Sequence, residues 1–312
     1  MRVTLIHNPG AGKQAKRNAD DLLDLMRASG HEPSYQSSKD DDWAQALEDP
    51  GELVVVAGGD GTVGRIAKRM AGRGVPMAVL PSGTANNISR SLGLVDRPFE
   101  ELVRAWPQAR RVKLDVGVAE GPWGMHYFVE GLGVGLFALL LSSGSGDAVK
   151  RSKTKAPAAK VDNALERLKQ KAETTKPIAI KASLDGKDIS GNYILLEAVN
   201  IPNIGPNLFI APDSKPGDGQ FDVVLVAETE RDRLVQYLAT WQENRERLAV
   251  LPSHQGKRLT MEWTGFEVHI DDELWPAEDE KPPAPPAHIE ARIESANVEF
   301  LVPPTNGKEK AR

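Results

Sequence analysis

The chain has 312 residues, with 39 lysines and arginines against 44 aspartates and glutamates, so its formal net charge is −5. A hydrophobic content of 40% and a charged content of 27% are ordinary for a folded globular protein, and the length predicts two domains. The absence of cysteine excludes disulfides, thiolate nucleophiles and cysteine-ligated metal sites, and the mildly acidic total argues against a nucleic-acid-binding protein.

The first hundred residues alternate between two hydrophobic periods. Short apolar segments of strand length are each followed by a segment in which apolar residues recur every three or four positions. We expect strands at residues 2–7, 33–37, 52–57 and 75–80, and helices near residues 15–26, 43–47, 63–70 and 88–92. Four strand-then-helix units predict an α/β N-terminal domain with a parallel sheet, whose ligands bind beyond the carboxyl ends of the strands.

Beyond residue 110, strand-like segments follow one another without regular intervening helices. We expect strands at residues 112–118, 126–134, 178–184, 193–200, 221–227, 259–270 and 288–302, and one helix at residues 231–248. Antiparallel pairing is the natural arrangement of such segments. A mostly antiparallel β-sandwich domain should therefore follow the α/β domain.

These patterns also set the expected domain boundaries. Residues 1–115 should form the α/β domain and residues 116–288 the β-rich domain, while a return of residues 289–303 to complete the first domain stays open. The polar tail at residues 304–312 is expected to be disordered. The lysine- and alanine-rich residues 149–176 and the proline-rich residues 276–286 are expected to be mobile or linker-like.

No segment is expected to cross a membrane. The most apolar run, Leu132–Leu141, is far shorter than the roughly 20 residues that a spanning helix needs. The N-terminus turns polar after Ile6 and lacks the long apolar stretch of a signal peptide. A cytoplasmic location fits these features.

The segment Gly58-Gly59-Asp60-Gly61-Thr62 directly follows the apolar third strand. Three glycines let the backbone turn sharply and approach a ligand closely, and the N–H groups at the start of the next helix favour an anion such as phosphate. Asp60 would repel that anion unless a cation such as Mg²⁺ lay between them. The alternative is a plain strand-to-helix turn in which Asp60 caps the helix.

Two other predicted strands end in loops rich in hydrogen-bond donors. The loop Asn8-Pro9-Gly10-Ala11-Gly12 follows the first strand, but the next residues, Lys13 and Gln14, do not complete a P-loop. It loosely mimics a dinucleotide-binding turn, yet the second strand ends in Gln36-Ser37-Ser38 without a carboxylate for a ribose. Ser82-Gly83-Thr84 follows the fourth strand and offers hydroxyls and N–H groups to phosphate or ribose.

Taken together, these motifs resemble the diacylglycerol kinase catalytic family, which includes bacterial lipid kinases and sphingosine and ceramide kinases. The loops match in order as Asn8-Pro9-x-x-Gly12, Gly58-Gly59-Asp60-Gly61-Thr62 and Leu80-Pro81-x-Gly83-Thr84-Ala85-Asn86. Later matches are Ala211-Pro212-Asp213 with Asp218-Gly219-Gln220-Phe221-Asp222, and Ile270-Asp271-Asp272-Glu273. Ordered matches spread over most of the chain are specific, where any one alone would be weak.

The resemblance implies ATP and Mg²⁺ as cofactors and gives single residues a role. Asp60 and Glu273 would be catalytic, with Glu273 as the general base that takes the proton of a lipid hydroxyl during in-line attack on the γ-phosphoryl group. Mg²⁺ would be bound by the Asp218 carboxylate and the carbonyls of Lys215 and Gln220. The nucleotide would be bound by Asn8, Pro9, Gly10, Ala11, Gly12, Ser38, Gly58, Gly59, Asp60, Gly61, Thr62 and Thr84.

Plainer interpretations stand beside these roles. Residues 271–273 could form an exposed acidic turn, and Asp218-Gly219 is an ordinary turn dipeptide. The histidines show no metal-binding spacing and are expected to be structural or surface residues. Gly64-Arg65 and Asn87 replace an Asn-Glu pair and an Asp that are common in the family, and Asp271, Asp272 and Glu273 all remain candidates for the base.

The sequence thus predicts an ATP-dependent lipid kinase acting on a diacylglycerol-like or sphingoid lipid. Two alternatives stay open: a catalytically inactive lipid- or nucleotide-binding module of the same fold, and a kinase of a soluble substrate similar to NAD kinases. Residues 131–141 are a candidate wall of the lipid site or a plain core segment. Residues 150–176 would contact an anionic inner membrane face peripherally or form a solvated loop or helix, and a homodimer is also open.

Overall fold

The computed structural model describes residues 1–11, 18–142, 157–243, 250–277 and 281–304. The chain divides into two compact units: the first comprises Met1–Leu114 with Ala296–Arg312, and the second comprises Asp115–Ser295. Both divisions fall inside strands, β5 (Arg110–Gly121) and β19 (Ala287–Val302). Gly12 and nearly all of the tail at residues 304–312 lie outside the described residues.

The first unit is built on a parallel sheet with the strand order β19–β4–β3–β1–β2. The strands besides β19 are β1 (Arg2–His7), β2 (Glu32–Ser37), β3 (Leu53–Gly58) and β4 (Met77–Pro81). From β1 the chain runs outward to β2 and then returns to β3 and β4 on the other side. Parallel crossovers are generally right-handed, so crossovers that leave β1 in opposite directions place helices on both faces of the sheet. All six residues of β3 are buried.

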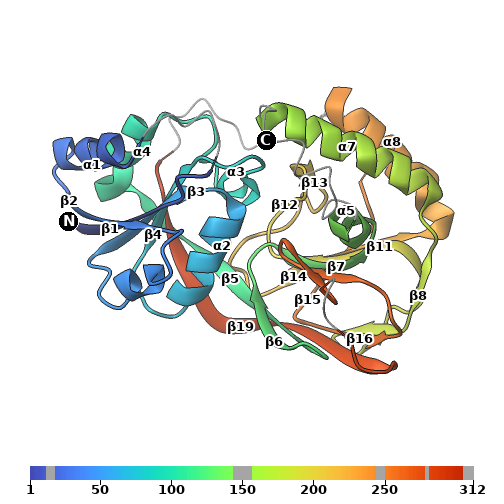
Figure 1. Cartoon of the computed structure of the whole chain (residues 1–312). Coiled ribbons are helices and arrows are strands. Elements are labelled where there is room, and N and C mark those ends of the chain that lie inside the picture. The colour runs from blue at the N-terminus through green and yellow to red at the C-terminus, as the bar shows by residue number, and fades with distance from the viewer. Residues whose placement is uncertain (12–17, 143–156, 244–249, 278–280, 305–312) are drawn as a thin grey trace. The chain divides into compact units, whose positions relative to one another are not determined.

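Figure 1 shows the helices of this unit lying against its sheet. The helix after β1 begins at Asn18, whose side chain accepts a hydrogen bond from the backbone N–H of Asp21. The helix after β3 buries Val63, Ile66 and Met70 on one stripe. The helical elements are α1 (Ala19–Ala28), η1 (Trp43–Leu47), α2 (Asp60–Met70), α3 (Asn87–Ser91), α4 (Phe99–Ala105) and η2 (Trp106–Gln108).

The second unit is dominated by antiparallel strands. One sheet has the order β15–β14–β11–β7–β17–β18, with β8 also paired to β11, and a second set pairs β10–β9–β16–β19. The strands are β6 (Gly124–Phe128), β7 (Gly131–Gly135), β8 (Ile178–Ile180), β9 (Ala182–Leu184), β10 (Lys187–Asp188), β11 (Gly191–Val199), β12 (Asn203–Ile204), β13 (Leu208–Phe209), β14 (Phe221–Ala227), β15 (Ser253–Gly256), β16 (Arg258–Trp263), β17 (Val268–Ile270) and β18 (Glu273–Trp275).

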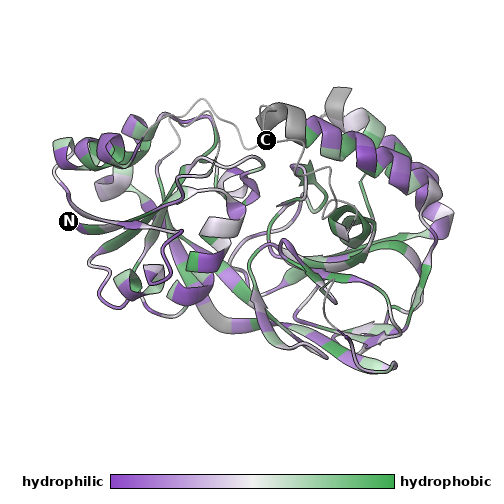
Figure 2. Cartoon of the chain, in the orientation of Figure 1, coloured by the Kyte–Doolittle hydropathy of each residue, from purple (hydrophilic) through white to green (hydrophobic). Residues whose placement is uncertain are grey.

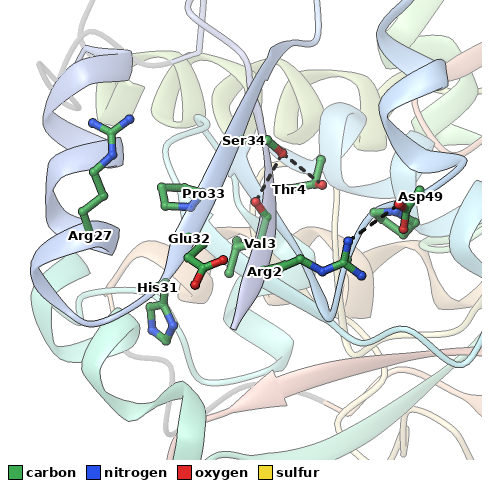
Figure 3. A pocket seen from close by; sticks show the side chains of 11 residues that line it. Arg2, Val3, Thr4, Arg27, His31, Glu32, Pro33, Ser34 and Asp49 are labelled. Atoms are coloured by element: carbon green, nitrogen blue, oxygen red, sulfur yellow. Dashed lines mark hydrogen bonds and ion pairs between the residues drawn. The ribbon is translucent and has the colours of Figure 1, made fainter.

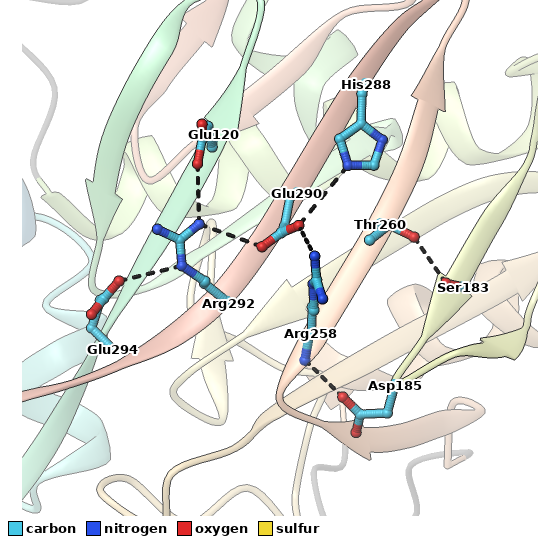
Figure 4. Close-up of polar contacts among 9 residues, drawn as sticks. All are labelled: Glu120, Ser183, Asp185, Arg258, Thr260, His288, Glu290, Arg292 and Glu294. Atoms are coloured by element: carbon cyan, nitrogen blue, oxygen red, sulfur yellow. Dashed lines mark hydrogen bonds and ion pairs between the residues drawn. The ribbon is translucent and has the colours of Figure 1, made fainter.

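Apolar side chains from the two sheets meet in one core, so the predicted antiparallel sandwich is confirmed. Leu196 and Phe221 come from the first sheet, and Met261, Trp263 and Ile289 come from the second. The outward side of β16, β19 and β5 carries alternating charges instead (Figure 4). Arg258 forms an ion pair with Glu290 at 2.6 Å, and Arg292 forms one with Glu120 at 3.3 Å.

A layer of helices covers the other face of the first sheet. Its members are α5 (Leu136–Ser142), which directly follows β7, α7 (Pro157–Thr174), and α8 (Arg231–Glu243), which the turn η3 (Glu228–Glu230) joins to β14. Leu165, Leu168 and Ala172 of α7 are buried against this layer, while Figure 2 shows hydrophilic residues along the visible side of the helix. The expectation that residues 149–176 are mobile is therefore wrong for residues 157–174, which an amphipathic pattern keeps in place.

Several sequence-predicted strands differ from those observed. Residues 126–134 and 259–270 each form two strands separated by a turn, and residues 178–184 are also divided. The apolar run expected as a lipid wall or core segment is the fully buried strand β7 followed by α5. Among the described residues, none of the helices has the length and apolarity that a membrane crossing requires.

Candidate functional site

Three loops of the first unit meet at the carboxyl ends of β1, β3 and β4. Asn8 follows β1, and its side-chain N–H group donates a hydrogen bond to the Thr62 hydroxyl at 3.0 Å. The Asn8 carboxamide oxygen accepts from the Gly10 backbone N–H at 3.0 Å, which shapes the start of the first loop. The backbone N–H of Ser82, after β4, donates to the Gly58 carbonyl at 3.0 Å. The structure therefore brings together the three predicted motifs.

The closest approach is between Gly59 and Gly83. A Cβ atom on Gly59 would lie 2.8 Å from the Cα of Gly83, well inside ordinary contact distance. A Cβ on Gly58 would likewise lie 2.8 Å from the Cβ of Thr62. Gly59 is required because its backbone touches that of Gly83, and Gly58 is required because a Cβ there would meet the Thr62 side chain, so neither position places a side chain between the loops.

Asp60 begins α2 but does not cap it. The N-cap of α2 is Gly59, and the Asp60 carboxylate instead accepts from the backbone N–H of Ile88 at 3.0 Å. Burial raises the pKa of Asp60, and backbone N–H groups from Asn86 to Ile88 oppose that rise. The plain interpretation that Asp60 caps its own helix is thus wrong, because the carboxylate joins the glycine loop to the start of α3.

The loop after β4 is held by Asn86, which the motif contains but to which the sequence analysis gave no role. The Asn86 carboxamide accepts from the Gly83 N–H at 2.9 Å and donates to the Gly83 carbonyl at 3.2 Å. Asn86 itself has a left-handed backbone with φ of 56°, a conformation that asparagine tolerates better than most residues. Thr84, at the tip of the loop, is exposed and available to a ligand.

Ser38 lies just after β2 and is buried, with no hydrogen-bond partner for its hydroxyl among the described residues. Its backbone N–H donates to His7 at 2.8 Å, and its carbonyl accepts from the Arg65 guanidinium at 2.9 Å. The Arg65 guanidinium also stacks 4.4 Å from the centre of the Trp43 ring. The sequence analysis did not predict this contact of Arg65 with Trp43, because no motif links η1 to α2 in sequence.

The residues predicted to bind Mg²⁺ lie together in one turn of the second unit. The Asp218 N–H donates to the Lys215 carbonyl at 3.3 Å, and the Asp218 carboxylate accepts from the Gln220 N–H at 3.0 Å. Asp115, which the motifs did not indicate, accepts from the Gly219 N–H at 2.7 Å and so fixes the turn. One carboxylate and two carbonyls are hard oxygen ligands of the kind that Mg²⁺ prefers.

Within the described residues no group of three or more histidine, cysteine, aspartate or glutamate side chains could hold a metal ion. A site with a single carboxylate and backbone carbonyls would not form such a group. Burial raises the pKa of Asp222, directly after this turn, and the neighbouring Asp218 and Asp213 carboxylates raise it further. An accumulation of negative charge at this turn is favourable to a divalent cation.

The three acidic residues near β18 differ in their surroundings. The Asp271 carboxylate accepts from the backbone N–H groups of Val129, Glu130 and Gly131, the shortest at 2.8 Å. Asp271 thereby fixes a turn, whereas Asp272 and Glu273 are exposed. Of the three candidates, Glu273 retains an accessible carboxylate on a regular strand.

A separate pocket of about 450 Å³ lies in the first unit at the opposite edge of the sheet (Figure 3). It is lined by residues at the amino ends of β1 and β2, among them Arg2, Thr4 and Ser34. Arg2 forms an exposed ion pair with Asp49 at 3.7 Å. Because the glycine loops follow the carboxyl ends of these strands, this pocket is not part of the candidate site.

Comparison with known proteins gives a consistent result. Residues 2–119 match the family described as Diacylglycerol kinase catalytic domain. The chain is 22% identical to a diacylglycerol kinase of Mycobacterium tuberculosis (strain ATCC 25618 / H37Rv) over 293 residues, which cover 88% of this chain and 89% of that one. It is 26% identical to a diacylglycerol kinase of Bacillus subtilis (strain 168) over 239 residues, with coverages of 72% and 73%.

A solved structure shares the fold. The crystal structure of a diacylglycerol kinase from Bacillus anthracis str. Sterne aligns with a TM-score of 0.65 at 21% identity, covering 97% of both chains. The alignment includes both the α/β unit and the strand-rich unit, since almost the whole chain is covered.

Proposed function

Since the chain belongs to the diacylglycerol kinase catalytic family and is a lipid kinase, we propose that it transfers the γ-phosphoryl group of ATP to a hydroxyl of a diacylglycerol-like or sphingoid lipid. The observation that carries this proposal is the backbone contact between Gly59 and Gly83, which only glycine allows. It presents the backbone of two loops, with the Asn8 loop beside them, where phosphate groups need N–H donors.

In this proposal the nucleotide is bound mainly by backbone N–H groups rather than by a lysine of a P-loop. Gly59 and Gly61 would supply backbone donors at the start of α2, where the helix dipole also favours negative charge, while the Thr62 N–H donates to the Gly59 carbonyl at 2.9 Å. Thr84 offers an exposed hydroxyl, and the buried Ser38 hydroxyl retains its hydrogen-bonding capacity. Asn8 and Asp60 fix these loops through their contacts with Thr62 and Ile88.

Asp218 with the carbonyls of Lys215 and Gln220 would hold Mg²⁺ in the second unit. When bound, Mg²⁺ supplies positive charge against the charge that develops on transferring phosphoryl oxygens. The protein's own part is the fixed turn, which Asp115 holds through the Gly219 N–H. Gly219 itself has φ of 78°, the left-handed conformation that glycine adopts without strain.

Glu273 is proposed as the general base. Its carboxylate is exposed at the start of β18, where strand pairing of Ile270 with Glu273 sets the backbone. Asp271 is less suited because three backbone N–H groups already occupy its carboxylate. Accepting the lipid hydroxyl proton at a carboxylate oxygen of Glu273 would make the hydroxyl oxygen a better nucleophile toward the γ-phosphorus.

The test is transfer of labelled γ-phosphate from ATP to lipid in vesicles, with diacylglycerol or a sphingoid base as acceptor and with or without anionic lipid. Glu273→Gln should lose transfer by about 100-fold or more while it still binds ATP, because a general base contributes up to about 10⁴-fold. Asp272→Asn is the matched control, since it removes the neighbouring exposed carboxylate. Unchanged turnover in Glu273→Gln would remove Glu273 from the mechanism.

The same assay separates the remaining alternatives. ATP binding without any labelled lipid would favour the inactive binding module, and a labelled soluble product would favour a different acceptor. A rate that rises with anionic lipid would support peripheral contact of a cytoplasmic enzyme with the membrane surface. Such contact would draw on basic residues of α7 such as Lys169 and Lys171.

A further inference from the structure

A glutamate and a histidine meet across the middle of the first sheet of the second unit. Glu197 on β11 and His269 on β17 both pair with Gly133 on the intervening strand β7. The Glu197 carboxylate reaches over Gly133 to the Nε2 atom of His269 at 2.8 Å. A Cβ on Gly133 would overlap that carboxylate, so the strand needs glycine here for space rather than for its backbone angles.

This pair lies in an apolar environment. Glu197 is 0% exposed and His269 is 2% exposed, and Phe137 of α5 contacts the imidazole with ring centres 6.4 Å apart. Leu195 and Val199, on the same strand face as Glu197, belong to the core under the helices. Burying a carboxylate and an imidazole is unfavourable relative to well-packed apolar side chains, so packing alone does not explain the pair.

The histidine connects the pair to the turn that carries the proposed base. His269 Nδ1 lies 3.0 Å from the Asp271 carbonyl oxygen, which can only accept, so Nδ1 carries the proton and donates it. The Asp271 N–H donates to the Gly131 carbonyl at 2.8 Å, and the Asp271 carboxylate is bound by N–H groups before β7. Asp271 has a left-handed backbone with φ of 52°, which aspartate adopts more readily than most residues, and these contacts stabilise it.

We propose that Glu197 and His269 are positioning residues that hold the Asp271–Glu273 turn in the conformation that aims Glu273 at the lipid hydroxyl. The proposal rests on the proposed role of Glu273 as general base. Glu197 fixes the imidazole plane through Nε2, and Nδ1 then fixes the carbonyl two residues before Glu273. Neither residue contacts substrate, and both act through the backbone of the turn.

The test separates the two ends of the imidazole. In His269→Gln the side-chain amide reaches the position of Nε2 and can still donate to the Glu197 carboxylate. The hydrogen bond from Nδ1 to the Asp271 carbonyl is lost. We expect kcat to fall about 10- to 100-fold with the KM for ATP unchanged, since a displacement near 1 Å costs up to about 100-fold. In Glu197→Gln the amide can donate to Nε2 of a neutral imidazole, Nδ1 keeps its donor role, and kcat should stay close to that of the wild type.

His254→Gln is the matched control, because His254 is exposed on β15 of the same sheet. Hydrogen exchange of the peptide containing residues 268–275 should accelerate in His269→Gln and not in His254→Gln. A folded His269→Gln enzyme with unchanged kcat and unchanged exchange in this peptide would overturn the proposal. If His269→Gln does not fold, Gly133→Ala, which displaces the Glu197 carboxylate, is held to the same two criteria.

Glu273→Gln is measured in parallel to keep the two proposals apart. If Glu273→Gln retains turnover, the base assignment fails, and hydrogen exchange alone then decides whether the pair holds the turn. If Glu273→Gln is inactive while His269→Gln has wild-type kcat and exchange, the base assignment stands and the positioning role fails.

Discussion

Gly59→Ala tests the contact on which the proposed nucleotide site depends. The new methyl carbon would lie 2.8 Å from the Cα of Gly83, against about 3.5–4.0 Å for ordinary carbon contacts, so the loops must separate by about 0.7–1.2 Å. Gly59 has φ of −100°, which alanine adopts without strain, so the effect is steric. We expect a loss of about 1–3 kcal/mol in the free energy of unfolding and a fall of up to about 100-fold in kcat/KM for ATP.

The assay combines thermal unfolding, with and without ATP, and phosphoryl-transfer kinetics. Gly74→Ala is the control, because Gly74 has φ of +73° and open space around a Cβ, so alanine there costs about 1–2 kcal/mol through the backbone alone. The control should lose stability and keep its kcat/KM for ATP. A Gly59→Ala protein that is stabilised by ATP as strongly as the wild type would refute the argument that these loops bind the nucleotide.

Two further outcomes are expected. Burial raises the pKa of Glu197. Burial alone would lower the pKa of His269, but the neighbouring Glu197 raises it above 6.5. The native pair therefore keeps a proton that the unfolded chain loses as pH rises. Above pH 6.5 the free energy of unfolding of the wild type should therefore fall with pH more steeply than that of Glu197→Gln, by up to about 1.4 kcal/mol per pH unit. Denaturant unfolding measured across this pH range would contradict the argument if both proteins showed the same dependence on pH. Asp218→Asn should raise the Mg²⁺ concentration for half-maximal activity by at least about 10-fold, with Asp213→Asn as control, and an unchanged Mg²⁺ titration would exclude Asp218 as a ligand.

The parts of the fold that follow from local patterns were predictable from the sequence. Strands of the first unit are short apolar segments between glycine-rich loops, and parallel pairing brings all their carboxyl ends to one edge. That is why loops after residues 7, 58 and 81 could be expected to meet. The turn at residues 215–220 was likewise visible, because its glycines and carboxylate lie within one short segment.

The remaining features depend on contacts that local sequence does not contain. Glu197 and His269 are 72 positions apart, and each alone looks like an isolated polar residue in an apolar strand. Their meeting depends on the register of three strands at Gly133, which hydrophobic alternation does not specify. The order of residues 157–174 was underestimated for a different reason: a helix was one of the open alternatives, but its many lysines outweighed the stripe of Leu165 and Leu168.

Arg65 shows how a departure from the family pattern can be structurally accommodated. The family commonly has a glutamate here, and its loss seemed to remove negative charge from the phosphate region. The Arg65 side chain instead stacks on Trp43 and donates to the Ser38 carbonyl, so its charge lies at the turn after β2. The carboxylate that remains in the glycine loop is Asp60, and backbone N–H groups of α3 bind it. In the proposed nucleotide site, the contacts of Asn8, Asp60 and Asn86 fix the loops, and none of these contacts involves residue 65.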